Sequence, residues 1–179
     1  MEALVTKVFL DGYKYVADST RNSAIWPQFV SEAQLLDVKI QIGDGLLNEL
    51  VTQFIAGTLT ALNNTLLDGG NYTYNSKVYL FQGLKAAIMY YAFGRFTNRV
   101  PFNYTALGVV KKESDFSDPA SDKAIQRLET ESRLTADAIM CENILYLNRH
   151  TADYPLWRVY GCGYRAGCKD KRPFKMIGD

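Results

Sequence analysis

The chain has 179 residues, of which 47% are hydrophobic and 22% are charged, and its formal net charge at pH 7 is +1. These proportions exclude an intrinsically disordered chain, and the length suits a single domain that buries its own core. A net charge this close to zero also excludes a protein whose overall field steers it to nucleic acid or to a membrane.

Aromatic residues are abundant, at 13% of the chain. They are enriched at protein interfaces, so the excess is a hint of assembly, and a tyrosine-rich core explains it equally well. The sparse, odd set of cysteines (Cys141, Cys162 and Cys168) fits a reducing compartment. There is no apolar run of about 18 residues, and the N-terminus does not resemble a signal peptide. We therefore expect a soluble protein made in the cytoplasm, with no membrane segment.

Residues 4–16 carry a hairpin signal, because β-branched and aromatic residues surround the pair Asp11-Gly12. A helix beginning near Leu4 is the alternative. The next segment, residues 17–27, reads as a loop. The first strong helical signal therefore comes only after this stretch.

A helix is predicted over residues 28–42, where Pro27 suits the helix start. Its apolar stripe comprises Phe29, Ala33, Leu36 and Ile40. A second helix is predicted over residues 46–62, with Gly57 as a weak point inside it.

Gly43-Asp44-Gly45 separates these two helices. The segment lacks the GxxxxGK[ST] spacing and the lysine of a phosphate loop, and it lacks the alternating acids of a calcium loop. We expect a corner between packed helices, in which the glycines let the chain turn and Asp44 caps the second helix.

Residues 63–79 form a turn-rich connection. Asp68-Gly69-Gly70 marks a reversal, and Thr73, Val78 and Tyr79 are typical of short strands. Residues 80–97 predict a third helix, which is apolar on nearly all sides, as in a helix buried inside a bundle.

Residues 100–121 predict a long irregular connection with one short strand over residues 108–111. Long loops of this kind tend to be functional or interfacial. Asp118 is the expected N-cap of the next helix, with Pro119 at its first position.

The helix after Pro119 is predicted to run to about Asn148, which makes it about 45 Å long. This exceeds the width of about 40 Å expected of a compact chain of this size, so part of the helix should pack against something beyond its own core. Its stripe comprises Ile125, Leu128, Ser132, Thr135 and Ile139, flanked by Ala124, Ala138, Cys141 and Leu145. The small, polar middle of the stripe permits close approach of a neighbouring helix. The acids of this helix, Asp137 among them, alternate with arginines, as on a solvated or subunit-facing surface.

The chain after residue 150 reads as an extended tail. Between positions 158 and 175 it holds six basic residues and one acid, which suits an acidic partner or a DNA backbone, or simply a solvated tail. The predicted organisation is a helical domain over residues 1–150 and a basic tail over residues 151–179, both part of one unit. The predicted fold class is mainly α: a helical bundle with one long helix in the C-terminal half, small β-hairpin elements and an extended C-terminal tail.

The residues that carry catalysis are scarce. His150 is the single histidine, at the expected end of the long helix, where a cation complements the helix dipole. Cys141 lies nine positions earlier on the same helix and points away from it, so no Cys–His pair forms. Cys162 and Cys168 lack the paired spacing of a zinc site. We expect no catalytic residue, no cofactor and no metal, and hence no enzyme.

Three segments, FVSEAQLLDVKIQIGDGLLNEL, YTYNSKVYLFQGLKAAIMYYAFGRF and TALGVVKKESDFSDPAS, together resemble the head–tail connector proteins of tailed double-stranded DNA phages. The resemblance spans residues 25–150 and is closest to the adaptor, or ring, proteins of crAss-like gut phages. Its motifs are an eAQ…D…iGD…L signature and a G(V/L)V-K-x-S connector. The tail with Cys162 and Cys168 is not part of it.

The resemblance implies a subunit that assembles as a twelvefold ring in the neck of the virion. Such a ring binds the portal protein on one side and a tail-side neck or ring protein on the other, and it encloses the DNA channel without sequence-specific binding. A stopper or tail-completion protein of the same neck and a DNA-binding packaging accessory that uses the basic tail are the alternatives.

Partner contacts are predicted in the long loop and in the tail, where aromatic and basic residues are typical hot spots. The predicted contact residues are Tyr104, Val109, Val110, Lys111, Lys112, Trp157, Arg158, Tyr160 and Arg165.

Overall fold

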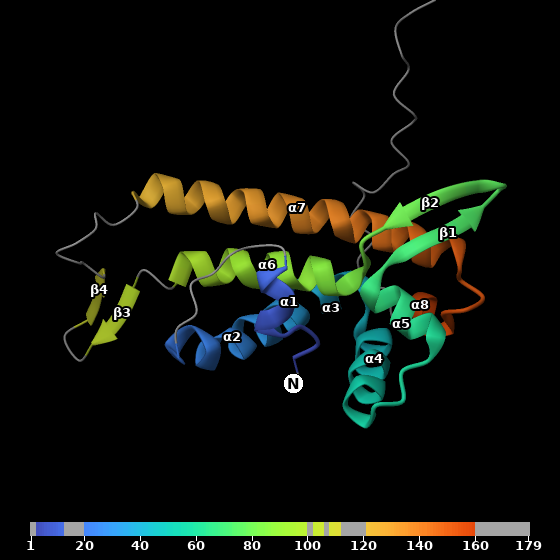
Figure 1. Cartoon of the computed structure of the whole chain (residues 1–179), viewed down its shortest axis with the longest axis horizontal. Helices are drawn as coiled ribbons and strands as arrows, with labels where there is room; N and C mark the ends of the chain where they lie inside the picture. Colours follow the sequence, from blue (N-terminus) through green and yellow to red (C-terminus); the bar gives the residue numbers. More distant parts are fainter. Residues whose placement is uncertain (1–2, 13–19, 100–101, 106–107, 112–120, 160–179) are drawn as a thin grey trace, which may run out of the picture.

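Helices make up most of the computed structural model, which describes residues 3–12, 20–99, 102–105, 108–111 and 121–159 (Figure 1). The helices are α1 (Lys7–Asp11), α2 (Thr20–Ala33), the π-helix η1 (Gln34–Val38), α3 (Lys39–Ile42), α4 (Asp44–Ala56), α5 (Ala61–Asp68), α6 (Gly83–Arg99), α7 (Asp122–Arg149) and α8 (Pro155–Val159). The strands form two antiparallel pairs, β1 (Gly70–Tyr74) with β2 (Lys77–Phe81) and β3 (Phe102–Thr105) with β4 (Gly108–Lys111). The predicted mainly α fold, with one long helix in the C-terminal half and small hairpins, is confirmed.

The centre of the fold is the antiparallel pair of α6 and α7 (Figure 1). Most of α6 is buried, as its apolar composition predicts. At Gly94 of α6 an added Cβ would lie 3.5 Å from the Cβ of Ser132 on α7. The small residues in the middle of α7 therefore do permit a close helix–helix approach. None of residues 122–131 is fully buried, and only Ile125 and Glu129 among them are partly covered, so most of the first third of α7 is exposed in the described part of the chain.

A π-helical turn interrupts the predicted helix over residues 28–42 and changes which face is buried. A π turn accommodates one extra residue, and the buried positions accordingly pass from Ala33 and Gln34 to Val38 and Ile42. Leu36 and Ile40, predicted as core, are instead 53% and 59% exposed. The prediction of a continuous apolar stripe was wrong because it assumed a constant period of 3.6 residues.

The corner at Gly43 is confirmed, since this residue has φ of +86° between α3 and α4. The expected cap is wrong: α4 begins at Asp44 itself, and the Asp44 carboxylate forms an ion pair with Lys39 at 2.7 Å. Helix α4 also ends sooner than predicted, at Ala56, because Gly57 adopts the left-handed conformation of a C-cap. A separate helix, α5, follows.

At the N-terminus the predicted hairpin and the predicted loop were wrong, and the alternative of a helix beginning near Leu4 agrees better with the structure. Residues around Asp11 form the short helix α1, with Thr6 as N-cap, rather than a hairpin. The predicted loop before Pro27 is also largely helical, because α2 begins at Thr20 and contains Pro27 within it. The N-terminal segment is tied to the bundle through the backbone N–H of Leu4, which donates to the side chain of Gln34 at 2.8 Å.

Strands β1 and β2 form the predicted hairpin, and α6 begins after it, at Gly83. Asn75 and Ser76 both have positive φ, as in the tight turns that suit a two-stranded ribbon. At the other end of the ribbon, Gly69 and Gly83 lie against each other's backbone. An added Cβ at either position would overlap main-chain atoms of the opposite segment.

The C-terminal half differs from the predictions in three details. Strand β4 was predicted, whereas its partner strand β3 was not. Ser121 caps α7, which spans 28 residues, or about 42 Å, whereas the predicted cap at Asp118 lies outside the described residues. The tail was predicted to be extended from residue 151, but Pro155–Val159 form α8, which packs against α4.

Candidate functional site

The predicted contact residues fall into separate parts of the structure. Tyr104 pairs with Val109 across the β3–β4 ribbon, and Val110 and Lys111 belong to the same ribbon. Arg158 lies on α8. The remaining positions, Lys112, Tyr160 and Arg165, lie outside the described residues.

Trp157 belongs to the hydrophobic core, with only 8% of its surface exposed. Its indole N–H donates to the side-chain oxygen of Asn148 at 3.1 Å, which joins α8 to α7. A side chain in this position stabilises the body of the protein and offers little surface to a partner.

The β1–β2 ribbon has one packed face and one uncovered face. On the packed face the rings of Tyr72 and Tyr79 stack at 5.5 Å, and the Arg149 guanidinium lies 4.0 Å from the centre of the Tyr79 ring. On the other face Val78 and Leu80 are 71% and 72% exposed. The alternation of side chains along a strand produces this division.

Lys77 begins β2 directly after the turn, beside Val78. It is exposed, and within the described part of the chain it has no ion-pair partner. The strand alternation puts the Lys77 side chain on the same face as Tyr79, opposite to the exposed Val78 and Leu80.

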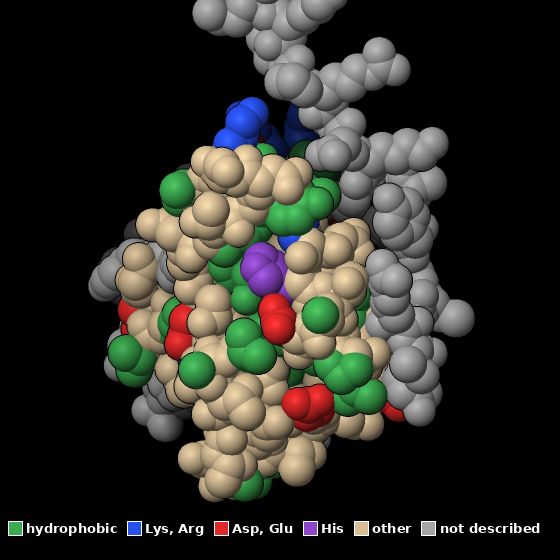
Figure 2. Space-filling view, turned by 90° about the vertical axis from the view of Figure 1, so that its right-hand side faces the viewer, with side chains coloured by type: hydrophobic (Ala, Val, Ile, Leu, Met, Phe, Trp, Pro, Cys, Tyr) green, Lys and Arg blue, Asp and Glu red, His purple; other side chains and the backbone are tan. Residues whose placement is uncertain are grey.

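His150 lies at the end of the molecule that carries this ribbon (Figure 2). It is the C-cap residue of α7, and its Nδ1 lies 2.9 Å from the carbonyl oxygen of Tyr146. Because a carbonyl only accepts, Nδ1 carries the proton. The imidazole also packs on the rings of Tyr146 and Tyr72. The predicted capping role of His150 therefore agrees with its position.

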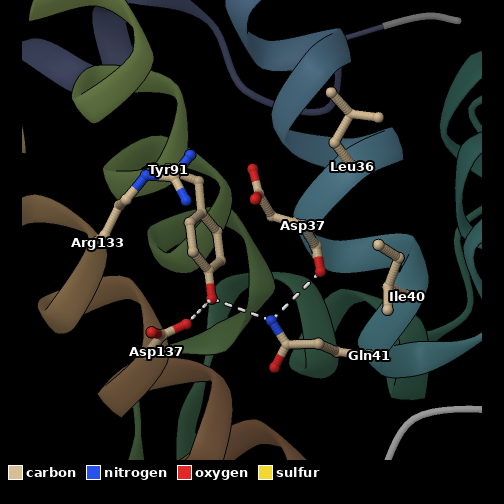
Figure 3. A pocket seen from close by; sticks show the side chains of 7 residues that line it. All are labelled: Leu36, Asp37, Ile40, Gln41, Tyr91, Arg133 and Asp137. Atoms are coloured by element: carbon tan, nitrogen blue, oxygen red, sulfur yellow. Dashed lines mark hydrogen bonds between the residues drawn. The ribbon is translucent and has the colours of Figure 1, made fainter. Parts of the chain in front are cut away.

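A pocket of about 110 Å³ opens between the η1–α3 segment, α6 and α7 (Figure 3). Its lining comprises Leu36, Asp37, Ile40, Gln41, Tyr91, Arg133 and Asp137. Leu36 and Ile40 stand one turn apart on the η1–α3 side, and both are largely exposed. The volume is below the roughly 300 Å³ or more of typical small-molecule sites, so the pocket suits the end of one side chain.

A hydrogen-bonded chain forms the inner wall of the pocket. The Gln41 side-chain amide donates to the Tyr91 hydroxyl at 3.0 Å, and this hydroxyl donates to the carboxylate of Asp137 (Figure 3). Burial, and next the hydrogen bond to Asp137, raise the pKa of Tyr91 above its ordinary value. Tyr91 therefore stays protonated at neutral pH and serves as a fixed donor.

The other charged groups at the pocket already have partners. Arg95 of α6 donates twice to Asp37, at 2.8 and 3.0 Å. Arg133 pairs with Glu129 on its own helix, at 3.3 Å. The Asp137 carboxylate accepts a hydrogen bond from the hydroxyl of Tyr91 but has no ion-pair partner among the described residues. The pocket thus contains one carboxylate without a cation.

The pocket and the ribbon face were not predicted as functional. Leu36 was assigned to a buried stripe, and Asp137 was read as one of several solvated acids. A signal was available for the ribbon, because Val78 and Leu80 alternate with Tyr79 and Phe81. Such alternation shows that a strand has two different faces, but it does not show which of two apolar faces is exposed to solvent.

The described residues contain no group of three or more His, Cys, Asp or Glu side chains suited to a metal ion. Cys141 on α7 is disulfide-bonded, and the other two cysteines lie outside the described residues. Among the described helices, none combines the length and the apolar character that crossing a membrane requires.

Comparison with known proteins gives one match. A family model described as "Family of unknown function (DUF6712)" matches residues 41–166, more than two thirds of the chain. No curated protein matches. No solved structure matches either.

Proposed function

The chain belongs to the DUF6712 family, a family of unknown function, and we propose that it is a structural subunit of the neck of a tailed double-stranded DNA phage. In this proposal, copies of the chain form a homo-oligomeric ring, twelvefold by the resemblance, that joins the portal vertex to the tail and continues the DNA channel. The protein is made in the host cytoplasm and is a permanent structural component of the virion.

The observation that carries the proposal is the distribution of uncovered apolar surface. Val78 and Leu80 are solvent-exposed on the β1–β2 ribbon, and Leu36 and Ile40 are solvent-exposed beside the pocket. Helix α7 adds Leu134, which is 64% exposed. A ring of identical subunits needs two different, complementary flanks on each copy, and this chain offers distinct apolar surfaces on different elements.

The segments that carry the resemblance coincide with these surfaces. The eAQ…D…iGD…L signature covers η1, α3 and the corner at Gly43, where Leu36 and Ile40 are exposed. The YTYNSKVYLF segment is the β1–β2 ribbon itself. The contacts predicted at Tyr104, Val109, Val110 and Lys111 map to the second ribbon, β3–β4, as a candidate surface for the portal protein or for a tail-side protein.

The proposal is tested by electron microscopy of phage particles and of the purified protein mixed with purified portal protein. The expected result is a ring of this protein between portal and tail. A particle in which the protein lies lower in the neck would favour a stopper or tail-completion role.

A DNA-binding packaging accessory is the alternative function, and it is tested by a DNA-binding assay. It predicts a DNA affinity that falls steeply with salt and disappears when residues 158–179 are removed. A protein that is absent from particles and does not bind portal complexes would contradict the neck proposal.

A further inference from the structure

We propose that the packed face of the β1–β2 ribbon contacts the phosphate backbone of DNA through Lys77 and Arg149. This inference rests on the proposed function, because the DNA in question is that of the channel which the ring encloses. Phosphate contacts of this kind depend on charge and carry no sequence preference. The uncovered face of the ribbon, with Val78 and Leu80, takes no part in the contact.

The strand register assembles the packed face. Tyr72 pairs with Tyr79, and Tyr74 pairs with Lys77, so these four side chains lie on the same side of the ribbon. Towards the turn this face opens to solvent, because Lys77 is exposed and Tyr74 is 38% exposed. Figure 1 shows this end of the ribbon projecting beyond the α6–α7 pair. A long ligand such as a DNA duplex can therefore reach it.

Arg149 places a second cation on the same face. Its guanidinium donates to the Tyr72 hydroxyl at 2.7 Å, and it lies 4.0 Å from the centre of the Tyr79 ring and 4.9 Å from that of Tyr74. Since Lys77 is the cross-strand partner of Tyr74, both cations border the same ring. A guanidinium has five N–H groups, so the hydrogen bond to Tyr72 leaves further donors for a phosphate oxygen.

Neither of these charges is neutralised within the part of the chain that the structure describes. Lys77 and Arg149 have no ion-pair partner there. No Asp or Glu occurs between positions 70 and 81, and the next acid after Arg149 in the chain is Asp153. Other cations of the fold are paired instead, among them Lys39, Lys85, Arg95 and Arg99. Two unneutralised cations at one place favour an anionic partner.

A phosphate backbone fits this face better than an acidic protein surface does. Lysine, arginine and tyrosine side chains all contact phosphates in protein–DNA complexes, and they make up the accessible end of the face. A protein interface has an apolar centre as well, but the exposed aliphatic side chains of the ribbon, Val78 and Leu80, lie on the opposite side. The ribbon can thus contact DNA with one face and protein with the other.

The test measures binding of the full-length protein to a DNA duplex of about 30 base pairs by fluorescence anisotropy, at salt concentrations from about 50 to 200 mM. Each phosphate contact contributes about 0.9 to the slope of log affinity against log salt concentration. Lys77→Gln should reduce this slope by about 0.9, so that the wild-type affinity falls about 3-fold more than that of the variant over this range. Adding Arg149→Gln should reduce the slope by about as much again.

Lys123→Gln is the matched control for Lys77→Gln. It removes another exposed lysine, at the start of α7, which lies at the other end of the molecule from the ribbon (Figure 1). It should leave the slope as in the wild type. The basic tail is present in every variant, so its contribution cancels in the comparison. Circular dichroism melting shows whether each variant folds, and if Arg149→Gln unfolds, the exposed Lys77 decides the question alone.

Three results would overturn the inference. The first is a wild-type chain that does not bind the duplex at about 50 mM salt. The second is a folded Lys77→Gln variant whose slope equals that of Lys123→Gln. The third is an unchanged slope together with weakened binding of Lys77→Gln to purified portal protein, which would assign the face to an acidic protein partner.

The proposed function is judged separately by microscopy of particles. A neck ring whose Lys77→Gln variant keeps the full slope would end the inference alone. The expected loss of slope in a protein that is absent from particles would end the neck proposal alone.

Discussion

Gly83 and Gly69 hold the base of the β1–β2 ribbon through backbone contacts that leave no room for a Cβ. Gly83 has φ of +76°, and an added Cβ would overlap the carbonyl oxygen of Leu67. Gly83→Ala should therefore lower the free energy of unfolding by about 2 to 5 kcal/mol, from the combined costs of strain and overlap. Urea denaturation measures the change.

Gly57 provides the matched control for this substitution. It also has positive φ, at +65°, but an added Cβ there would meet nothing within 4 Å. Gly57→Ala should cost only about 1 kcal/mol, because strain acts without overlap. Equal effects of the two substitutions would show that the close approach at the ribbon base has no energetic weight.

Tyr91 makes stability sensitive to alkaline pH. Its pKa is raised above the ordinary 10.0 by burial and then by the hydrogen bond to Asp137. The neutral form is thus favoured by folding, so its contribution is complete below the unfolded pKa and declines as pH rises above it. Burial first, and then the hydrogen bond with Tyr146, raise the pKa of Tyr154 in the same direction.

We therefore expect the unfolding free energy to fall as the pH rises above about 10, the ordinary pKa of tyrosine. Tyr91→Phe should reduce the steepness of this fall and leave the part due to Tyr154. Guanidinium denaturation at a series of pH values measures it. An unchanged slope in the Tyr91→Phe variant would contradict the assignment.

At the scale of elements, the ion pair between Asp37 and Arg95 fixes η1 to α6. The two side chains are each 12% exposed, and their closest atoms lie 2.8 Å apart. Asp37→Asn should cost about 2 to 4 kcal/mol, because it removes the closer of the two carboxylates beside a largely buried guanidinium and leaves it only Glu32, at 3.7 Å. A double-mutant cycle with Arg95→Gln by chemical denaturation gives the coupling energy.

The pair Arg127–Glu131 is the comparison, since it joins two exposed side chains on α7 at 2.9 Å. Its coupling energy should stay below about 0.5 kcal/mol, because solvent screens exposed pairs. A coupling at Asp37–Arg95 as small as this would mean that the π turn is held by its packing alone.

The elements that sequence predicts well are those with one dominant local cause. The apolar composition of α6 predicts its burial, and Asp68-Gly69-Gly70 predicts the chain reversal before β1. The π turn is different, because the residues of Gln34–Val38 suit an α-helix equally well and only packing selects the wider turn. The exposure of Leu36 and Ile40, and with it the rim of the pocket, depends on that turn.

Pro27 and Asp137 show the same limit. Proline is favoured at a helix start, yet α2 continues through this position. The ionic character of the pocket likewise depends on distant contacts, because Asp137 and Tyr91 are 46 positions apart in the chain. Short-range patterns contain no information on such pairs.

At the scale of the whole molecule, α7 has one face packed in the core and one face exposed. Ile144 is 4% exposed and lies in the core, whereas Leu134 is 64% exposed. Ile144→Ala should lower the unfolding free energy by about 2 to 5 kcal/mol. Leu134→Ser should change it by less than about 0.5 kcal/mol in the monomer.

Both values come from thermal or chemical unfolding of dilute protein, and the same variants can be followed by sedimentation at high concentration. If Leu134 lies at a contact of the proposed ring, Leu134→Ser should weaken assembly while leaving the monomer intact. A large loss of monomer stability in Leu134→Ser would show that this leucine already belongs to the core.

The clamped base of the β1–β2 ribbon has a consequence for the entropy of association. Its two ends are held at Gly69 and Gly83, and its inner face is fixed by the stacked rings of Tyr72 and Tyr79. Most of its conformational freedom is therefore lost on folding, before any partner arrives. A surface ordered in advance loses less entropy on binding, so even a contact of modest area can hold neighbouring subunits together.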